Sequence, residues 1–460
     1  MAGISFELKK TLKGKKLTNL LLAFTYSTSL SAGPWIISIL SIIFAGFAAE
    51  QAGVPHEIVR KYQIVVTYIT AFSLIISGPF QLLFTRYIAD RLFEKKENKL
   101  LPNFTGVLFV NLLLSFIFGI CFTWFTSLKN IFYEMPWFVI LFILSLILMT
   151  GLWMINTLLT SFKNYKYILF AFIAGFGSMI ITAPYTGKYE LTGLMFSFFI
   201  GLLIVFSLLT GYIFYQYSSD KIVEFEFLNR KKVFISLSFT GLFYNIGIWA
   251  DKFIFWLSPL TGEKVIDPFK ASIVYDIPIF LAYLAISPGM GIFFLKLESE
   301  FAEYYERYYS AVRGGETLDR IYELGVELVN AVRALVQEVL RIQAIAVIII
   351  YLMEFIIFKF LHYSPLYLPL FNILLLGTYL QLVVMTIIAI HFYFDLKSYA
   401  LYTTFSFALL NIIFTILSIY AGPFYYGYGF LGSLLISFLV GIFLLRRFLG
   451  EIHYRTFMLI

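Results

Sequence analysis

Long uninterrupted apolar runs dominate the pattern of this sequence. Twelve stretches each supply the roughly 20 apolar residues that a helix needs to cross the ~30 Å hydrocarbon layer of a bilayer. They are continuous and lack the period-2 alternation of a membrane β-barrel. The pattern therefore predicts an all-α, polytopic membrane protein. The predicted spans cover residues 18–48, 62–86, 104–127, 136–160, 166–186, 190–216, 233–258, 271–295, 342–361, 366–391, 398–420 and 427–445.

The distribution of Lys and Arg between the loops predicts the orientation of the spans. With the N-terminus inside, the inner segments carry 26 of the 34 basic residues, the outer loops carry 7, and Lys252 lies within a span. Positive charges concentrate on the cytoplasmic side of membrane proteins. The sequence therefore predicts that both termini lie inside the cell.

Composition supports this class and excludes several others. Hydrophobic residues make up 60% of the 460 residues and charged residues only 13%, whereas a soluble domain is usually nearer ~25% charged. The single Cys121 excludes an internal disulfide, and the four His match no metal-ligand spacing. No phosphate-binding Gly-x-x-x-x-Gly-Lys-Ser/Thr loop occurs. We expect no catalytic residue, cofactor, metal or bound nucleic acid. We interpret the net charge of +7 as a reflection of the membrane orientation of the loops, not as a sign of nucleic-acid binding.

Weak self-similarity at about half the chain length predicts two lobes. Residues 76–79 (ISGP) resemble 286–289 (ISPG) at an offset of 210, and 33–35 (GPW) resemble 247–249 (GIW) at 214. Both halves begin on the same side, so the predicted repeat is parallel, with its axis along the membrane normal. The expected organisation is a lobe of six spans at 1–217, a cytoplasmic linker at 218–232, and a second lobe of six spans at 233–460.

Gly and Pro within three predicted spans are candidate hinges. Proline removes one backbone hydrogen bond of a helix, and the freed carbonyl is tolerated at membrane depth where it faces protein or a wet cavity. We expect the first, second and eighth spans to line a central cleft, although Gly and Pro are also common in ordinary membrane helices. The hinge candidates are Gly33, Pro34, Gly78, Pro79, Pro288 and Gly289.

The inner segment between spans 8 and 9 is too long for a simple loop. It predicts a cytoplasmic helical hairpin over residues 297–341, with a turn at Gly314-Gly315 and Thr317 as helix N-cap. After Thr317, apolar residues recur at helical spacing. This apolar stripe either packs against the first arm or docks a partner, and the sequence leaves both open. Its members are Leu318, Ile321, Leu328, Val332, Leu335, Val336 and Val339.

Ionisable residues inside spans are costly in lipid and are candidates for function. Because neighbouring residues on a helix do not face each other, we expect Lys252 to pair with Asp276 or Glu354 rather than with Asp251. Asp251 would then be free for a cationic substrate, a proton or a metal cation. The alternative is a purely structural cluster of ion pairs. The candidate transport-path residues are Asp251, Lys252, Asp276, Glu354, Tyr244, Asn245, Trp35 and Gln81.

Several segments resemble one family across essentially the whole chain. The opening at 1–10 (MAGISFELKK), the run 31–35 (SAGPW), the run 244–256 (YNIGIWADKFIFW) and the segment 304–315 are similar to PelG-type transporters of the MOP superfamily of flippases and exporters. Ser5 replaces an expected Gly, a minor departure.

The resemblance implies a subunit of the bacterial cytoplasmic membrane that exports the Pel exopolysaccharide, a partly cationic amino-sugar polymer. It also implies partners, namely a cytosolic glycosyltransferase and a cyclic-di-GMP-sensing membrane subunit. Acids such as Asp251 and Asp276 would suit a cationic polymer. The alternative function is an ion-gradient-driven MOP-type transporter of drugs or lipid-linked oligosaccharides.

Overall fold

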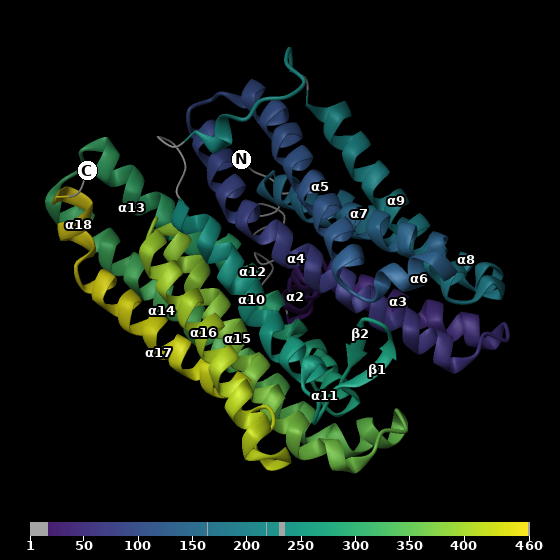
Figure 1. The fold of residues 1–460 in the computed structure, drawn as a ribbon. Coiled ribbons are helices and arrows are strands. Elements are labelled where there is room, and N and C mark those ends of the chain that lie inside the picture. Colours follow the sequence, from purple (N-terminus) through teal and green to yellow (C-terminus); the bar gives the residue numbers. More distant parts are fainter. Residues whose placement is uncertain (1–16, 163, 218, 230–234, 459–460) are drawn as a thin grey trace. The chain divides into compact units, whose positions relative to one another are not determined.

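The computed structural model describes residues 17–162, 164–217, 219–229 and 235–458, and it divides by internal contacts into two units (Figure 1). The N-terminal unit comprises Pro34–Ser272 and the C-terminal unit comprises Met1–Gly33 with Ile273–Ile460. The resembling segment at residues 1–10 lies outside the described residues.

The N-terminal unit is built from seven long helices, a short helix and a small β-hairpin. Its elements are α3 (Gly33–Gln51), α4 (His56–Phe93), α5 (Leu100–Phe125), α6 (Leu128–Glu134), α7 (Pro136–Ser161), α8 (Tyr165–Thr186), α9 (Glu190–Gln216), α10 (Ile235–Leu257), β1 (Glu263–Ile266) and β2 (Phe269–Ala271), with single 3-10 turns at Glu97–Lys99, Gly187–Tyr189 and Glu226–Leu228.

The C-terminal unit contains the first described helix together with the last two fifths of the chain. Its elements are α2 (Leu17–Ser31), α11 (Ile273–Leu284), α12 (Ser287–Lys296), a π-helical turn (Leu297–Phe301), α13 (Ala302–Gly314), α14 (Leu318–Phe360), α15 (Leu368–Tyr393), α16 (Lys397–Ala421), α17 (Tyr428–Gly450) and α18 (Ile452–Met458), with 3-10 turns at Pro365–Tyr367 and Pro423–Tyr425.

The helices confirm the all-α membrane class. Each of the twelve predicted spans coincides with one helix or with two consecutive helices. In the described part of the chain, ten helical runs are long and apolar enough to cross a membrane, and one of them, Tyr165–Gln216, holds both α8 and α9. The count of twelve spans and their orientation stay predictions.

The division into units does not coincide with the linker predicted at 218–232. Helix α10 packs against α4 in the N-terminal unit, and α2 packs against α12 in the C-terminal unit. The chain therefore passes from one unit to the other at Gly33-Pro34 and again at Ser272-Ile273. The assignment of six consecutive spans to each repeat stays a prediction.

One close helix crossing in the N-terminal unit corresponds to one in the C-terminal unit. In the N-terminal unit, Gly78 of α4 meets Gly241 of α10, and a Cβ on Gly78 would lie 2.9 Å from the Gly241 carbonyl oxygen. In the C-terminal unit, the Ser27 hydroxyl of α2 donates to the Gly291 carbonyl of α12 at 2.7 Å. Small residues permit such close approach of membrane helices. Gly241 follows Ser27 by 214 positions and Gly291 follows Gly78 by 213, offsets close to that of the predicted repeat. In this alignment Gly78 corresponds to Gly291 rather than to Pro288.

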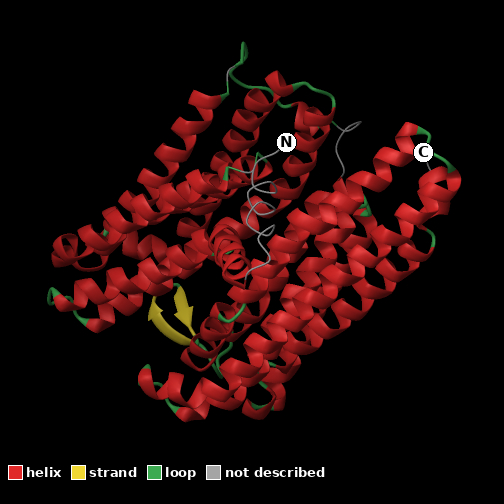
Figure 2. Cartoon of the chain, turned by 180° about the vertical axis from the view of Figure 1, so that it is seen from behind, coloured by secondary structure: helices red, strands yellow, loops and turns green. Residues whose placement is uncertain are grey.

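The loop after α10 forms a β-hairpin, which the sequence analysis did not foresee (Figure 2). Strands β1 and β2 pair antiparallel, and the Tyr68 side chain of α4 fixes the second strand. The Tyr68 hydroxyl donates to the Lys270 carbonyl at 2.9 Å and accepts from the Lys270 N–H at 3.2 Å. The Tyr68 ring stacks on Trp256 with centroids 4.6 Å apart. The hairpin is thus anchored to α4 through an aromatic cluster.

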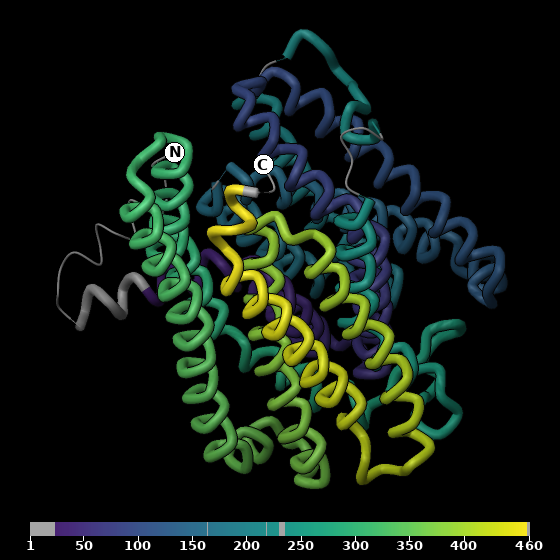
Figure 3. The backbone as a smooth tube through the Cα atoms, turned by 90° about the vertical axis from the view of Figure 1, so that its left-hand side faces the viewer, coloured from purple at the N-terminus to yellow at the C-terminus, as the bar shows by residue number. Residues whose placement is uncertain are grey.

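The predicted helical hairpin is present, and its apolar stripe is mostly buried. Helix α13 ends at Gly314, Gly315 adopts a left-handed φ of +67°, and α14 returns as one long helix (green in Figure 3). Thr317 occupies the N-cap position but makes no capping hydrogen bond through its side chain. Six of the seven stripe residues are buried, and Leu318 alone is exposed. The stripe therefore packs within the protein, and the alternative that a partner docks on it is wrong.

Helix α18 contributes to this packing. The Tyr308 hydroxyl of α13 lies 3.3 Å from the Thr456 hydroxyl and 3.4 Å from His453 Nδ1. Gly325 of α14 faces the His453 imidazole, and a Cβ at this position would collide with the ring. The C-terminal helix is thus enclosed by both arms of the hairpin.

Candidate transport site

Asp251 and Lys252 of α10 form a buried ion pair. Lys252 Nζ lies 3.1 Å from Asp251 Oδ2, and it also donates to the Ile248 carbonyl at 2.8 Å. The Asp251 side chain is fully buried and that of Lys252 is 7% exposed. The prediction that these neighbours would not pair is wrong, because the long stem of Lys252 bends back along the helix and brings its ammonium group to the preceding carboxylate.

The other candidates of the N-terminal unit lie on α3, α4 and α10. Asn245 is buried at the close crossing and donates to the Gly241 carbonyl at 3.1 Å, and its amide nitrogen would lie 2.6 Å from a Cβ on Gly78. Tyr244 and Trp35 are half-buried. These contacts place Asn245 and Gly78 together.

Helix α4 carries a short polar track beside this crossing. Gln81 donates to the Ser77 hydroxyl at 2.8 Å, and Ser77 donates to the Ser73 carbonyl at 2.7 Å. Trp153 of α7 donates its indole N–H to the Ser73 hydroxyl at 3.0 Å. The helix continues through Pro79, and the role of Gly78 and Pro79 as a hinge stays a prediction.

In the C-terminal unit, the chain breaks between α11 and α12 at the predicted Pro288-Gly289 position. Pro288 has no N–H for the Leu284 carbonyl, and the Ser287 hydroxyl donates to that carbonyl instead at 2.9 Å. Gln343 of α14 closes the rest of the gap. Its side-chain oxygen accepts from the Gly289 N–H at 3.0 Å, and its nitrogen donates to the Ala285 carbonyl at 2.9 Å. The break is therefore braced by a fully buried side chain.

Asp276 and Glu354 are also in the C-terminal unit, but on different elements. Asp276 lies in the first turn of α11 and is half-buried, where a carboxylate interacts favourably with the helix dipole. Glu354 of α14 accepts from the Asn372 amide at 3.3 Å, and its other oxygen, Oε2, is buried without a hydrogen bond.

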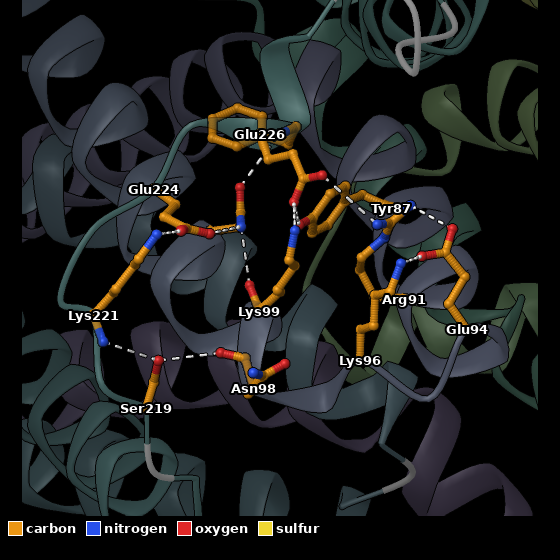
Figure 4. Close-up of polar contacts among 12 residues, drawn as sticks. Tyr87, Arg91, Glu94, Lys96, Asn98, Lys99, Ser219, Lys221, Glu224 and Glu226 are labelled. Atoms are coloured by element: carbon orange, nitrogen blue, oxygen red, sulfur yellow. Dashed lines mark hydrogen bonds and ion pairs between the residues drawn. The ribbon is translucent and has the colours of Figure 1, made fainter.

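The segment before α10 is held against the C-terminal end of α4 and the N-terminal end of α5 by a polar network (Figure 4). The Glu226 carboxylate accepts from Lys99 Nζ at 3.1 Å and from the Tyr87 hydroxyl at 3.2 Å. Glu224 accepts from Lys221 at 2.6 Å, and the hydrogen bond to Glu224 raises the pKa of Lys221 above its ordinary value. The described part of the predicted linker, residues 219–229, is therefore fixed on the N-terminal unit.

Backbone and apolar contacts add to this network, which we call the linker clasp (residues 219–229 with Tyr87, Arg91, Lys99 and Asn103). The Glu224 N–H donates to the Pro102 carbonyl at 2.9 Å, and Asn103 accepts from the Phe227 N–H at 3.2 Å. The Phe227 ring is buried against Phe84, with centroids 6.2 Å apart. Sequence reasoning identified the linker from its polarity but offered no signal for these partners.

The fold is similar to that of MOP superfamily transporters. A MOP superfamily transporter from Pyrococcus furiosus matches with a TM-score of 0.63 at 13% identity, covering 92% of this chain and 96% of that chain. An outward-facing multidrug resistance MATE family transporter gives 0.63 at 14% identity with 93% and 96% coverage, and an inward-facing one gives 0.59 at 13% identity with 92% and 96% coverage.

The sequence places the chain more narrowly within this class. The model of the PelG family, described as a putative exopolysaccharide exporter, matches residues 1–457. The chain belongs to this family. A search of curated proteins finds no match.

Proposed function

We propose that this protein exports the Pel exopolysaccharide across the bacterial cytoplasmic membrane as the polymer leaves its synthase. The match of the PelG family model to residues 1–457 carries this proposal. The MOP fold supports it, because that fold supplies membrane helices arranged as two units.

Export would proceed by alternating access of the two units. The structural neighbours include MATE transporters in outward-facing and inward-facing conformations. In this chain the two passages between units are Gly33-Pro34 and Ser272-Ile273. Pro34 lacks the N–H that would bond to the Leu30 carbonyl, so this passage has one helical hydrogen bond fewer to resist bending. We assign the hinge to Gly33 and Pro34, and we assign a fixed bend to Pro288 and Gly289 because Gln343 braces them.

The Asp251–Lys252 pair is the proposed contact for a cationic polymer. Within the pair, Lys252 already occupies the Asp251 carboxylate. An amino-sugar ammonium group would compete with Lys252 for that carboxylate. When no polymer is bound, Lys252 would neutralise Asp251, so that no isolated charge is left at membrane depth. Asn245, Tyr244 and Gln81 would supply hydrogen bonds along α10 and α4.

The proposed partners are a cytosolic glycosyltransferase and a cyclic-di-GMP-sensing membrane subunit. Since the apolar stripe of the hairpin is buried, docking would use its exposed polar face, which includes Glu316, Asp319 and Glu323. Tethering the synthase here would raise its local concentration at the inner mouth to the ~mM range. A pull-down of the glycosyltransferase with Glu316→Lys/Asp319→Lys tests this face, and retention of the synthase at wild-type levels would contradict it.

The export proposal is tested by removing the protein from cells that make the polymer. We expect secreted Pel to disappear while the synthase is still present, and the wild-type chain to restore secretion. A strain that secretes normally without the protein would overturn the proposal.

Two of the structural neighbours are multidrug resistance transporters, which makes a transporter of drugs or lipid-linked oligosaccharides the alternative. That function predicts that cells expressing the chain gain resistance to small cationic drugs in the absence of any polysaccharide synthase. Resistance of this kind, without an effect on polymer secretion, would favour the alternative.

A further inference from the structure

The C-terminal unit has a groove between the first half of α14 and the end of α17, with a volume of about 590 Å³. Most residues that line it are aliphatic, among them Val332, Val336 and Leu445. The two charged ones are Arg333 and Arg446, one from each helix. A groove of this size falls within the ~300–1,000 Å³ range of small-ligand sites.

These two arginines differ from most of the others on the same helices. Arg320 pairs with Glu323 at 2.6 Å, Arg341 pairs with Glu338 at 3.5 Å, and Arg447 lies 3.9 Å from Glu451. Among the described residues, neither Arg333 nor Arg446 has an ion-pair or hydrogen-bond partner.

The sequence around them explains this lack of partners. No acid lies three or four positions away from Arg333 or from Arg446 on its own helix, the spacing at which ion pairs form along a helix. Their guanidinium groups are therefore available to an external anion.

The groove also adjoins surface that is suited to lipid. Beyond it, the same face of α14 continues with Ala344, Val347 and Tyr351, which are half-buried or exposed. Arg446 directly follows the predicted twelfth span, which ends at residue 445. With the predicted orientation, the groove therefore lies at the level of the headgroups of the cytoplasmic leaflet.

We propose that this groove binds one anionic phospholipid of the cytoplasmic leaflet. The lipid phosphate lies between Arg333 and Arg446, and an acyl chain follows the aliphatic wall of the groove towards Val347. Basic pockets between membrane helices on this side of a bilayer are suited to anionic headgroups. An acidic protein segment could satisfy the same arginines, but the small volume and the continuous apolar surface favour a lipid.

Bound in this way, the lipid would bridge α14 and α17 and fasten the cytoplasmic hairpin to the last membrane span. The site does not depend on the nature of the exported substrate.

The test compares lipid retention by the purified, delipidated full chain in mixed micelles of phosphatidylglycerol or phosphatidylcholine, measured by native mass spectrometry. We expect the wild type to retain phosphatidylglycerol selectively. Arg333→Gln/Arg446→Gln should weaken this binding about 30-fold. The matched control Arg320→Gln/Arg341→Gln loses the same charge from paired arginines and should bind like the wild type.

A second variant protects the test against a folding defect. Gln337→Glu keeps both arginines but places a carboxylate four residues after Arg333, where it competes with the phosphate. It should also lose phosphatidylglycerol while its melting temperature without lipid stays unchanged. Equal retention by the groove variants and the control would overturn the proposal. So would equal binding of phosphatidylcholine, or a co-purifying protein lost from the arginine variant while lipid retention is unchanged.

Discussion

The side chain of Gln343 stands in the place of a missing turn of backbone next to Gly289. Its amide accepts from the Gly289 N–H and donates to the Ala285 carbonyl across a sequence separation of more than 50 residues. One side chain thereby satisfies both a buried donor and a buried acceptor that the helix break leaves open. This bond pair ties α14, and with it the hairpin, to the bend in the eighth predicted span.

Replacing Gln343 with Leu should destabilise the C-terminal unit. The change leaves the Gly289 N–H and the Ala285 carbonyl without their partners, which costs about 2–4 kcal/mol for two buried groups. The measurement is the melting temperature of the purified protein in detergent. Asn330→Leu, at an exposed position of the same helix, is the control and should melt like the wild type. Equal melting of both variants would show that water replaces the amide.

Replacing Asp251 with Asn should lower the yield of folded protein. The change removes the carboxylate charge that lies 3.1 Å from Lys252, and breaking a buried ion pair costs about 3–5 kcal/mol. The double variant Asp251→Asn/Lys252→Met removes both charges and should recover most of that yield, as measured by size-exclusion chromatography.

Polymer secretion by the double variant then separates the two roles of the pair. If Asp251 contacts the polymer, the folded double variant should secrete at least tenfold less Pel than the wild type. Secretion at the wild-type level would assign the pair a structural role alone.

Replacing Gly106 with Ala should release the linker clasp. A Cβ at this position of α5 would collide with the Glu224 carbonyl oxygen, and the backbone cannot yield without moving residues 219–229. Trypsin should then cut after Lys221 severalfold faster, with the fragments identified by mass spectrometry. Gly211→Ala is the control, because its Cβ would meet nothing within 4 Å. Unchanged cleavage in the Gly106 variant would mean that the segment is already mobile.

Acidification should loosen helix α18. Burial lowers the pKa of the His453 imidazole below its ordinary value of 6.5, so the docked helix favours the neutral ring. Its stabilising effect is complete above pH 6.5 and is lost as the pH falls below that value, because the undocked ring binds a proton first. Hydrogen exchange over 452–458, corrected for the intrinsic rate, should therefore rise on acidification. A His453→Gln variant should lose this pH dependence, and identical profiles for both proteins would refute the assignment.

The features that were predicted correctly from the sequence are those determined by residues close together in the chain. A helix that crosses the interior of a bilayer needs a continuous apolar run, so the positions of the helices could be predicted from the apolar runs. The return of the cytoplasmic hairpin depends on Gly315, whose positive φ suits glycine. The break at Pro288 follows from its missing N–H.

The features that it missed depend on partners far away in the sequence or on flexible side chains. Gln343 has no signal of its own, since its role exists only beside Gly289. The β-hairpin has strands of four and three residues, too short for a periodic pattern. The Asp251–Lys252 pair arises from the bending of a four-carbon stem, and the burial of the stripe requires α18 as well as α13.

The packing of α2 against α12, which is far away in the sequence, also governs how the chain is made. Helix α2 finds its packing partner α12 only after residues 34–272 have been synthesised, on the order of 10 to 50 seconds later at typical translation rates. During that interval the whole N-terminal unit can assemble. Helix α2 remains in the bilayer without its packing partner, and the hydrogen bond from the Ser27 hydroxyl to Gly291 cannot form. The C-terminal unit is therefore completed late, after its first helix has been inserted. A chain that is terminated before α12 leaves α2 without its packing partner.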